Sequence, residues 1–142
     1  MTATGVEPAF SETLLLFDLG GRTFGVRAKL VLRALPYREP MALPKGHASI
    51  HGVLQDRGTV IALLRDPLGA GAGEIVQEAA APTRTLVCAT SLGHIGIPAV
   101  AARDVITLGF DHPLVSGAVV DSEAGPLTYI EPEAIAKRLL DG

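Results

Sequence analysis

At 142 residues the chain has the length of one domain, or of two tightly joined halves. Apolar residues make up 48% and aromatic residues only 4%, with no Trp, so we expect a core built from aliphatic side chains. A formal net charge of −3 and the lack of any basic cluster argue against a nucleic-acid partner. The single Cys88 excludes an internal disulfide framework and fits a reducing compartment.

The N-terminus carries neither of the usual targeting signals. Residues 1–12 (MTATGVEPAFSE) lack a basic stretch followed by an apolar one, so they do not read as a signal peptide. No apolar run approaches the roughly 18 residues that a spanning helix needs. The sequence therefore predicts a soluble, cytoplasmic protein without direct membrane insertion.

In chain order, residues 1–12 are expected to form a loose tail, and short apolar runs follow. Residues 14–26 surround Gly20 and Gly21, which favour the tight turn of a β-hairpin. Residues 29–37 fit a short helix or a strand equally well, because their apolar period is ambiguous. Residues 36–47 hold three prolines and predict a loop or a sheet edge.

A second hairpin is predicted over Gly52–Leu64 (GVLQDRGTVIALL), where Asp and Gly supply the turn between two apolar runs. Residues 69–82 are rich in Gly and Ala and read as a connection. After this connection the strand pattern resumes at Thr85. The chain should end in a short helix after Glu131, because Pro132 suits a first helical turn.

The two halves of the chain resemble each other. LLLFDLGGRTFGV (14–26) aligns without a gap on TLVCATSLGHIGI (85–97), and GVLQD (52–56) matches GAVVD (117–121), at separations of 71 and 65 residues. Each half is too small to stand alone comfortably. We therefore predict a mainly β fold of two pseudo-repeated five-stranded β-barrels, one from residues 13–68 and one from residues 83–142, that share a core.

The duplicated pattern, with an Arg-Gly turn in the first half only, resembles the CheW-like family of chemotaxis coupling domains. The resemblance covers roughly residues 13–135, and its most specific piece is Gly-Val-Leu-x-x-Arg-Gly-x-Val-Ile, beginning at Gly52. It implies two five-stranded barrels and no catalysis. Such proteins bridge the cytoplasmic tips of methyl-accepting receptors to a CheA-type histidine kinase.

The resemblance also implies a receptor site in the groove between the barrels. By this match, Arg57 of the Arg-Gly turn helps to form the site. Val31 and Leu35 would lie on the same groove wall, with Val105 as the counterpart from the second half.

Three departures from the family pattern fall where the resemblance implies a kinase-binding surface. Arg33 and Arg65 stand where the family commonly has acids, and Ala62 stands where it has a proline. Like charges placed together at an interface cost several kcal/mol, on the order expected for misplaced charge. We therefore expect kinase binding to be weak or absent, with the chain acting as an accessory coupler beside another CheW-like protein.

Other residue patterns give little support for a metal, catalytic or phosphate-binding site. His47 and His51 have the spacing of a helical metal pair, but glycines flank them and no third ligand follows, so we expect no metal and no cofactor. Cys88 sits within an apolar run and reads as a buried small side chain. The GAGAG stretch lacks the residues of a phosphate loop. An enzyme is therefore not expected, and the alternative function is a small β-barrel module that binds a ligand or an oligonucleotide.

Overall fold

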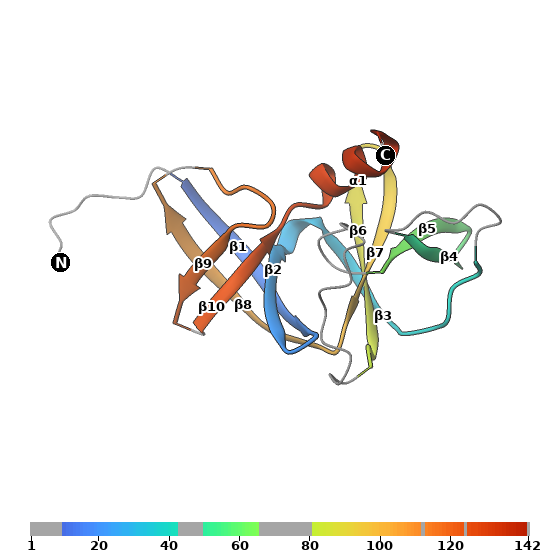
Figure 1. Cartoon of the computed structure of the whole chain (residues 1–142), viewed down its shortest axis with the longest axis horizontal. Coiled ribbons are helices and arrows are strands. Elements are labelled where there is room, and N and C mark those ends of the chain that lie inside the picture. Colours follow the sequence, from blue (N-terminus) through green and yellow to red (C-terminus); the bar gives the residue numbers. More distant parts are fainter. Residues whose placement is uncertain (1–9, 43–49, 66–80, 112, 124, 142) are drawn as a thin grey trace, which may run out of the picture.

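The computed structural model describes residues 10–42, 50–65, 81–111, 113–123 and 125–141. For residues 139–141 it describes the backbone but not the side chains. Ten strands, a short 3₁₀ helix and a C-terminal α-helix occupy these residues (Figure 1). In chain order they are β1 Phe10–Leu19, β2 Arg22–Arg27, η1 Ala28–Leu30, β3 Val31–Pro36, β4 Ile50–Asp56, β5 Thr59–Leu64, β6 Arg84–Thr90, β7 Gly93–Ala99, β8 Ala101–Phe110, β9 Val119–Ser122, β10 Gly125–Ile130 and α1 Pro132–Asp141.

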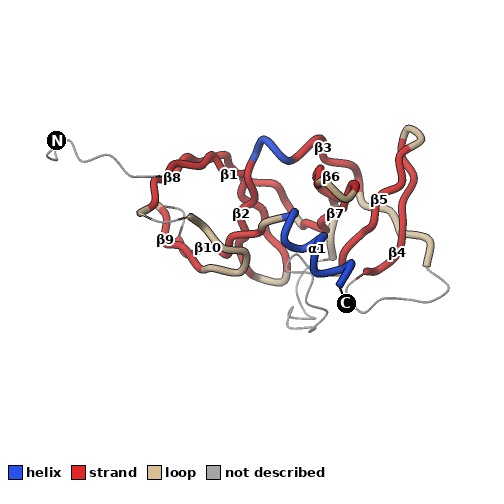
Figure 2. Tube along the Cα trace, turned by 90° about the horizontal axis from the view of Figure 1, so that it is seen from above, coloured by secondary structure: helices blue, strands red, loops and turns tan. Residues whose placement is uncertain are grey.

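The strands form two five-stranded sheets that lie side by side (Figures 1 and 2). We call the sheet in the order β8-β1-β2-β10-β9 lobe A and the sheet in the order β3-β6-β7-β5-β4 lobe B. In both lobes two antiparallel hairpins meet through one parallel pair of strands, β2 with β10 and β7 with β5. The prediction of two pseudo-equivalent five-stranded units is confirmed.

The connectivity differs from the predicted division into residues 13–68 and 83–142. Each sheet combines the first two strands of one repeat with the last three strands of the other. The chain leaves lobe A after β2 and returns after β7, so the two repeats exchange strands. The predicted tail also ends earlier, because β1 begins at Phe10 and pairs along its length with β8. Most of the predicted connection, 69–82, lies outside the described residues.

The first hairpin of each repeat follows the predicted alignment. β1 and β2 pair from Leu14↔Arg27 to Leu19↔Arg22, and β6 and β7 pair from Thr85↔Pro98 to Thr90↔Gly93, so the two ladders share one register. Both turns hold two residues, as the glycines at the first turn predicted. The segment 29–37, for which helix and strand were both open, divides between η1 and β3.

The second matched piece is shifted by one residue. The hairpin predicted over Gly52–Leu64 is present, with β4 ending at Asp56 and β5 beginning at Thr59. The corresponding strand β9 ends at Ser122, one residue beyond the Asp121 that the sequence alignment placed opposite Asp56. A shift of one residue moves every side chain to the opposite face of a strand. The match of GVLQD with GAVVD is therefore out of register with the fold.

The buried side chains form three clusters. The largest joins the lobes, because it takes Phe17, Phe24 and Ile130 from lobe A and Leu64 and Leu86 from lobe B. A second cluster, around Leu14 and Leu127, lies within lobe A, and a third, around Leu54 and Ile61, lies within lobe B. The predicted shared core is this junction cluster, and it is mainly aliphatic apart from the stacked rings of Phe17 and Phe24.

The helix α1 closes the junction on the side of lobe B. It buries Ile135 completely within the junction cluster, and it contacts β6 and β7. The carboxylate of Glu133 accepts hydrogen bonds from the backbone N–H and the hydroxyl group of Ser91, in the turn between β6 and β7. These contacts fix the helix predicted after Glu131 to one lobe.

Equivalent glycines in β2 and β7 permit close packing inside the lobes. A Cβ added at Gly96 would lie 2.8 Å from Cγ2 of Thr85, whereas one added at Gly25 would lie 3.1 Å from Cδ1 of Leu127. We expect Gly96→Ala to lower the free energy of unfolding by about 1–3 kcal/mol, as overpacked cores do. Gly25→Ala should lower it less. Urea unfolding of both variants tests this ranking, which an equal or reversed effect would contradict.

Candidate functional site

Arg57 occupies a strained backbone position at the tip of the β4–β5 hairpin. Its φ is +52°, and Arg57 is the only residue other than glycine with positive φ in the described part of the chain. With Gly58 at +80° it forms a two-residue turn whose central residues both need left-handed backbone. Asn, Asp or Gly is preferred there, because the Cβ of other residues crowds the backbone in this conformation at a cost of about 1–2 kcal/mol. The exposed arginine is therefore held where the turn alone would favour another residue.

An ion pair fixes this turn to β3. Nε and Nη2 of Arg33 lie 2.9 and 2.8 Å from Oδ2 of Asp56, the residue directly before Arg57. β3 and β4 are the two edge strands of lobe B, so this pair links the open edges of the sheet. Farther along β4, Met41 and Val53 exchange backbone hydrogen bonds of 2.8 and 2.9 Å. These contacts position the Arg57 turn relative to the rest of lobe B.

Val31 and Val105 lie at the edge of the junction between the lobes. Val31 is partly buried against the junction cluster, as are Leu15 and Val100. Val105, on the edge strand β8, pairs directly with Leu15 and is 59% exposed. Directly opposed residues on antiparallel strands have neighbouring side chains. The structure therefore connects Val31 and Val105 to one apolar region through Leu15.

Leu35 packs against a different cluster from Val31. It lies on β3 opposite Thr85 and packs against the internal cluster of lobe B, with Leu54, Ile61 and Val87. The strand alternation that places Leu35 inside the lobe exposes Leu32, Ala34 and Pro36 on the other face. Leu35 thus supports β3 from within, and Leu32, which is 47% exposed, is the large apolar side chain that β3 presents outward.

The three residues of the implied kinase surface have different surroundings in the structure. Arg33 is neutralised by Asp56, as described above. Ala62 lies on β5 beside Ile95 and lines a hollow of about 210 Å³ with Leu92, His94 and Ala136. Arg65 follows β5 and is exposed. The charge that distinguishes this surface is therefore that of Arg65.

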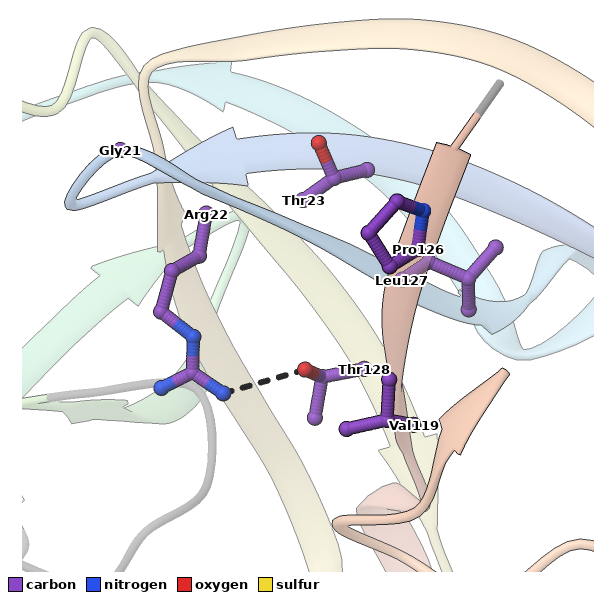
Figure 3. Close-up of a pocket in the computed structure, with 7 residues that line it drawn as sticks. All are labelled: Gly21, Arg22, Thr23, Val119, Pro126, Leu127 and Thr128. Carbon is purple, nitrogen blue, oxygen red and sulfur yellow. Dashed lines mark hydrogen bonds between the residues drawn. The ribbon is translucent and has the colours of Figure 1, made fainter. Parts of the chain in front are cut away.

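A larger hollow of about 410 Å³ lies on lobe A, beside the β1–β2 turn (Figure 3). Arg22 reaches across it, donating a hydrogen bond of 3.1 Å from Nη2 to Oγ1 of Thr128, and its guanidinium lies 5.1 Å from the ring centre of Phe24. Arg22 thereby covers the outer end of the junction cluster. The residues lining this hollow include no carboxylate, histidine or cysteine: Gly21, Arg22, Thr23, Val119, Pro126, Leu127 and Thr128.

Cys88 and the two histidines that the structure describes, His51 and His94, do not gather with other possible metal ligands. Burial raises the pKa of the Cys88 thiol to about 12, so this side chain stays protonated within the junction cluster. His47 lies outside the described residues, whereas His51 is 3.4 Å from the hydroxyl of Tyr37. Within the described ranges, no three His, Cys, Asp or Glu side chains gather as metal ligands would. No helix among those residues is long and apolar enough to cross a membrane.

The sequence interpretation missed Asp56, Leu15 and Leu32. By sequence Asp56 is only a turn residue, and nothing local links it to Arg33, 23 positions earlier. Leu15 lies in an apolar run in which both faces of β1 are covered, so alternation could not single it out. Leu32 could be separated from Leu35 only after η1 was known to end where β3 begins.

The chain forms a β scaffold of two five-stranded lobes around a shared junction. A hairpin turn is held against the edge of one lobe. A model of the CheW-like domain family matches residues 13–135, and the chain belongs to this family of chemotaxis scaffold and adaptor proteins. Among solved structures, the scaffolding protein TtCheW from Thermoanaerobacter tengcongensis is similar in fold, with a TM-score of 0.69 at 15% identity. The alignment covers 95% of this chain and 92% of that one. No curated protein sequence matches the chain.

Proposed function

We propose that the chain is a non-enzymatic cytoplasmic adaptor that binds the cytoplasmic tip of methyl-accepting receptors and couples them to a CheA-type histidine kinase. The receptor's helical pair would lie along the junction between the lobes, against Val31 and Val105. Arg57 would hold it from the β4–β5 turn. Helix-in-groove recognition takes its affinity from aliphatic anchors and its orientation from a few polar groups.

The observation that carries this proposal is the backbone of Arg57. Strained residues persist where the surrounding structure holds them, and they concentrate at functional positions. The Arg33–Asp56 pair supplies such support at 2.8 Å. A turn selected for stability alone would have Asn, Asp or Gly at this position. An arginine at this position is explained if the guanidinium itself has a partner outside the chain.

Leu32 replaces Leu35 as the proposed receptor contact from β3. Leu35 packs inside lobe B, where a receptor helix cannot reach most of its surface. Leu32 is exposed on the outer face of the same strand. The proposed receptor set is therefore Arg57, Val31, Leu32 and Val105, with Leu35 as internal support.

The proposal for the kinase is weak binding, so that the chain serves as an accessory coupler. Arg33 contributes little to this weakness, because its charge is balanced by Asp56 within the chain. Arg65 remains exposed where the family commonly has an acid, and Ala62 leaves the hollow beside it partly unfilled. Both features lie on the β5 side of lobe B.

Arg65→Asp should strengthen binding to the kinase regulatory domain. Changing the sign of one charge at the edge of an interface alters affinity mainly through association rate, and we expect a gain of about ten-fold. Arg84→Asp, an equal charge change at an exposed position on β6, is the matched control. Calorimetric titration of the three proteins measures this, and an unchanged affinity for Arg65→Asp would remove Arg65 from the kinase surface.

The alternative function, a small β-barrel module for oligonucleotides, predicts a different binding partner. Capture of the purified protein on an immobilised receptor tip, beside an immobilised single-stranded oligonucleotide, separates the two. We expect retention on the receptor tip alone. Retention on the oligonucleotide alone would favour the alternative, which the aromatic content of 4% makes harder to support because base stacking needs aromatic faces.

A further inference from the structure

One end of lobe A gathers charged side chains on the inner face of its strands. Glu12 lies two residues before Leu14 on β1, and side chains two residues apart share a face of a strand. Arg27 stands in the same relation to Gly25, whose missing side chain faces Leu14 and Leu127. Tyr129 belongs to the internal cluster of lobe A itself. These groups therefore line the interior of the lobe at the end away from the β1–β2 turn.

Arg27 is neutralised within this group. Its Nη2 lies 2.7 Å from both carboxylate oxygens of Glu131, and the hydroxyl of Tyr129 donates to Oε1 of Glu131 at 2.7 Å. Burial, and then the bond to Glu131, raise the pKa of Tyr129, so the phenol remains a neutral donor. The Nε of Arg27 has no hydrogen-bond partner and no contact with solvent, so it offers nothing to a bound molecule. The positive charge of Arg27 is thus balanced by the carboxylate of Glu131.

A cavity of about 160 Å³ opens beside this pair. Aromatic rings and a second carboxylate line it together with Arg27, Glu131, Pro113 and Leu114: the rings are Phe10, Phe110 and Tyr129, and the carboxylate is that of Glu12. Glu12 forms no close ion pair with a cation in the described part of the chain, although its charge also acts on Arg27. Two carboxylates and one guanidinium leave the cavity with a formal charge of −1.

The corresponding end of lobe B shows that the fold does not need this arrangement. By the shared register, Pro98 in β7 takes the place of Arg27 in β2. Leu63, opposite Gly96, takes the place of Tyr129, opposite Gly25. These two positions of lobe B are apolar, whereas Arg65 stands where lobe A has Glu131, each two residues after the matched Leu63 and Tyr129. Charges removed from water stabilise a fold poorly compared with apolar residues of similar size. The ion pair of Arg27 with Glu131 is therefore particular to lobe A.

We propose that this cavity binds a small organic cation of the alkylammonium type. An ammonium group would lie beside Glu12 and the aromatic rings, which attract cations through their faces, while its alkyl part would contact apolar lining such as Leu114. The volume of this cavity is close to that of an apolar cavity of about 150 Å³, engineered in another protein, that holds benzene. It therefore admits a ligand of a few carbon atoms and excludes nucleotides. The net negative charge of the lining disfavours anions.

Titration of the ¹⁵N-labelled protein with n-butylammonium tests the proposal. We expect saturable shifts of the amides around Glu12, Arg27 and Tyr129, with a dissociation constant on the order of 1 mM, as suits a ligand of few atoms. Sodium butyrate and n-butanol have the same chain length with opposite or no charge. Neither should bind measurably, and equal binding of either would overturn the proposal, as would the absence of saturation with n-butylammonium.

Two variants distinguish this site from general surface charge. Glu12→Gln should weaken n-butylammonium binding by about ten-fold, and Phe110→Leu should weaken it several-fold. Asp121→Asn removes one exposed carboxylate from β9 and should leave binding unchanged. Circular dichroism establishes that each variant is folded before titration. Equal losses in Glu12→Gln and Asp121→Asn would show that net charge alone attracts the cation, and the site would be rejected.

Discussion

Replacing Arg57 by alanine is expected to lower affinity for the receptor tip by about 5- to 150-fold, without loss of stability. The fold-change corresponds to the roughly 1–3 kcal/mol associated with an arginine that contributes strongly to an interface. Stability should hold because the side chain is exposed at the tip of a turn. Calorimetric titration measures the affinity, and urea unfolding measures the stability.

Arg57→Asn sharpens this test by separating binding from folding. Asn tolerates left-handed backbone better than Arg, so the variant should unfold with a free energy equal to or higher than that of the parent, by up to about 1 kcal/mol. It should still lose receptor affinity, as the alanine variant does. Arg57→Lys keeps the charge but lacks the planar fork of donors. Its receptor affinity should therefore fall between that of the parent and that of the Asn variant. If all three variants bind like the parent, Arg57 is only a turn residue.

Phe17→Ala is expected to lower the free energy of unfolding by about 3–5 kcal/mol, the usual range for a buried aromatic side chain. Phe17 is completely buried, and its ring stacks on that of Phe24 with centroids 5.5 Å apart. Globular domains are stable by only about 5–15 kcal/mol. The variant should therefore be marginally folded at room temperature.

The position of Phe17 in the junction cluster predicts how the lobes unfold. Because the cluster takes side chains from both sheets, its loss should destabilise the lobes together and leave one cooperative transition. Tyr129 reports on lobe A and Tyr37 on lobe B, so single-tyrosine variants can follow each lobe separately. Val60→Ala, at a position 60% exposed, is the control and should change stability by less than about 0.5 kcal/mol. Two separate transitions in the Phe17→Ala protein would contradict a shared core.

Local turn chemistry made part of the fold predictable. Gly20 and Gly21 predict the β1–β2 turn, and the sequence around Arg57 predicts the β4–β5 turn. Both predictions depend only on residues close together in the chain. Turn residues could not predict the exchange of strands between the lobes. It depends on the parallel pairs β2–β10 and β5–β7, whose partners lie far apart along the chain. A division at the Gly- and Ala-rich connection was therefore natural from composition, and it does not match the sheets.

For the candidate site, the sequence alone gives the exposed position of Arg57, because a hairpin turn exposes it whatever the remaining fold. Its role at a receptor site comes from the family resemblance and stays a prediction. The choice between Leu32 and Leu35 depends on one strand boundary, since the two residues point to opposite faces of β3. The partner of Arg33 depends on the two edge strands of lobe B approaching each other. The sequence therefore presented Arg33 as a free charge, whereas the structure pairs it with Asp56.

Amide chemical-shift mapping of the bound receptor tip tests the central claim most directly. The proposal predicts that saturating receptor tip shifts residues at the junction of the lobes, around Val31, Leu32 and Val105, together with Arg57 and Gly58. Residues on the outer face of β9, such as Val119, should be unaffected. Shifts confined to that face, or no saturable shifts at all, would contradict the placement of the receptor between the lobes.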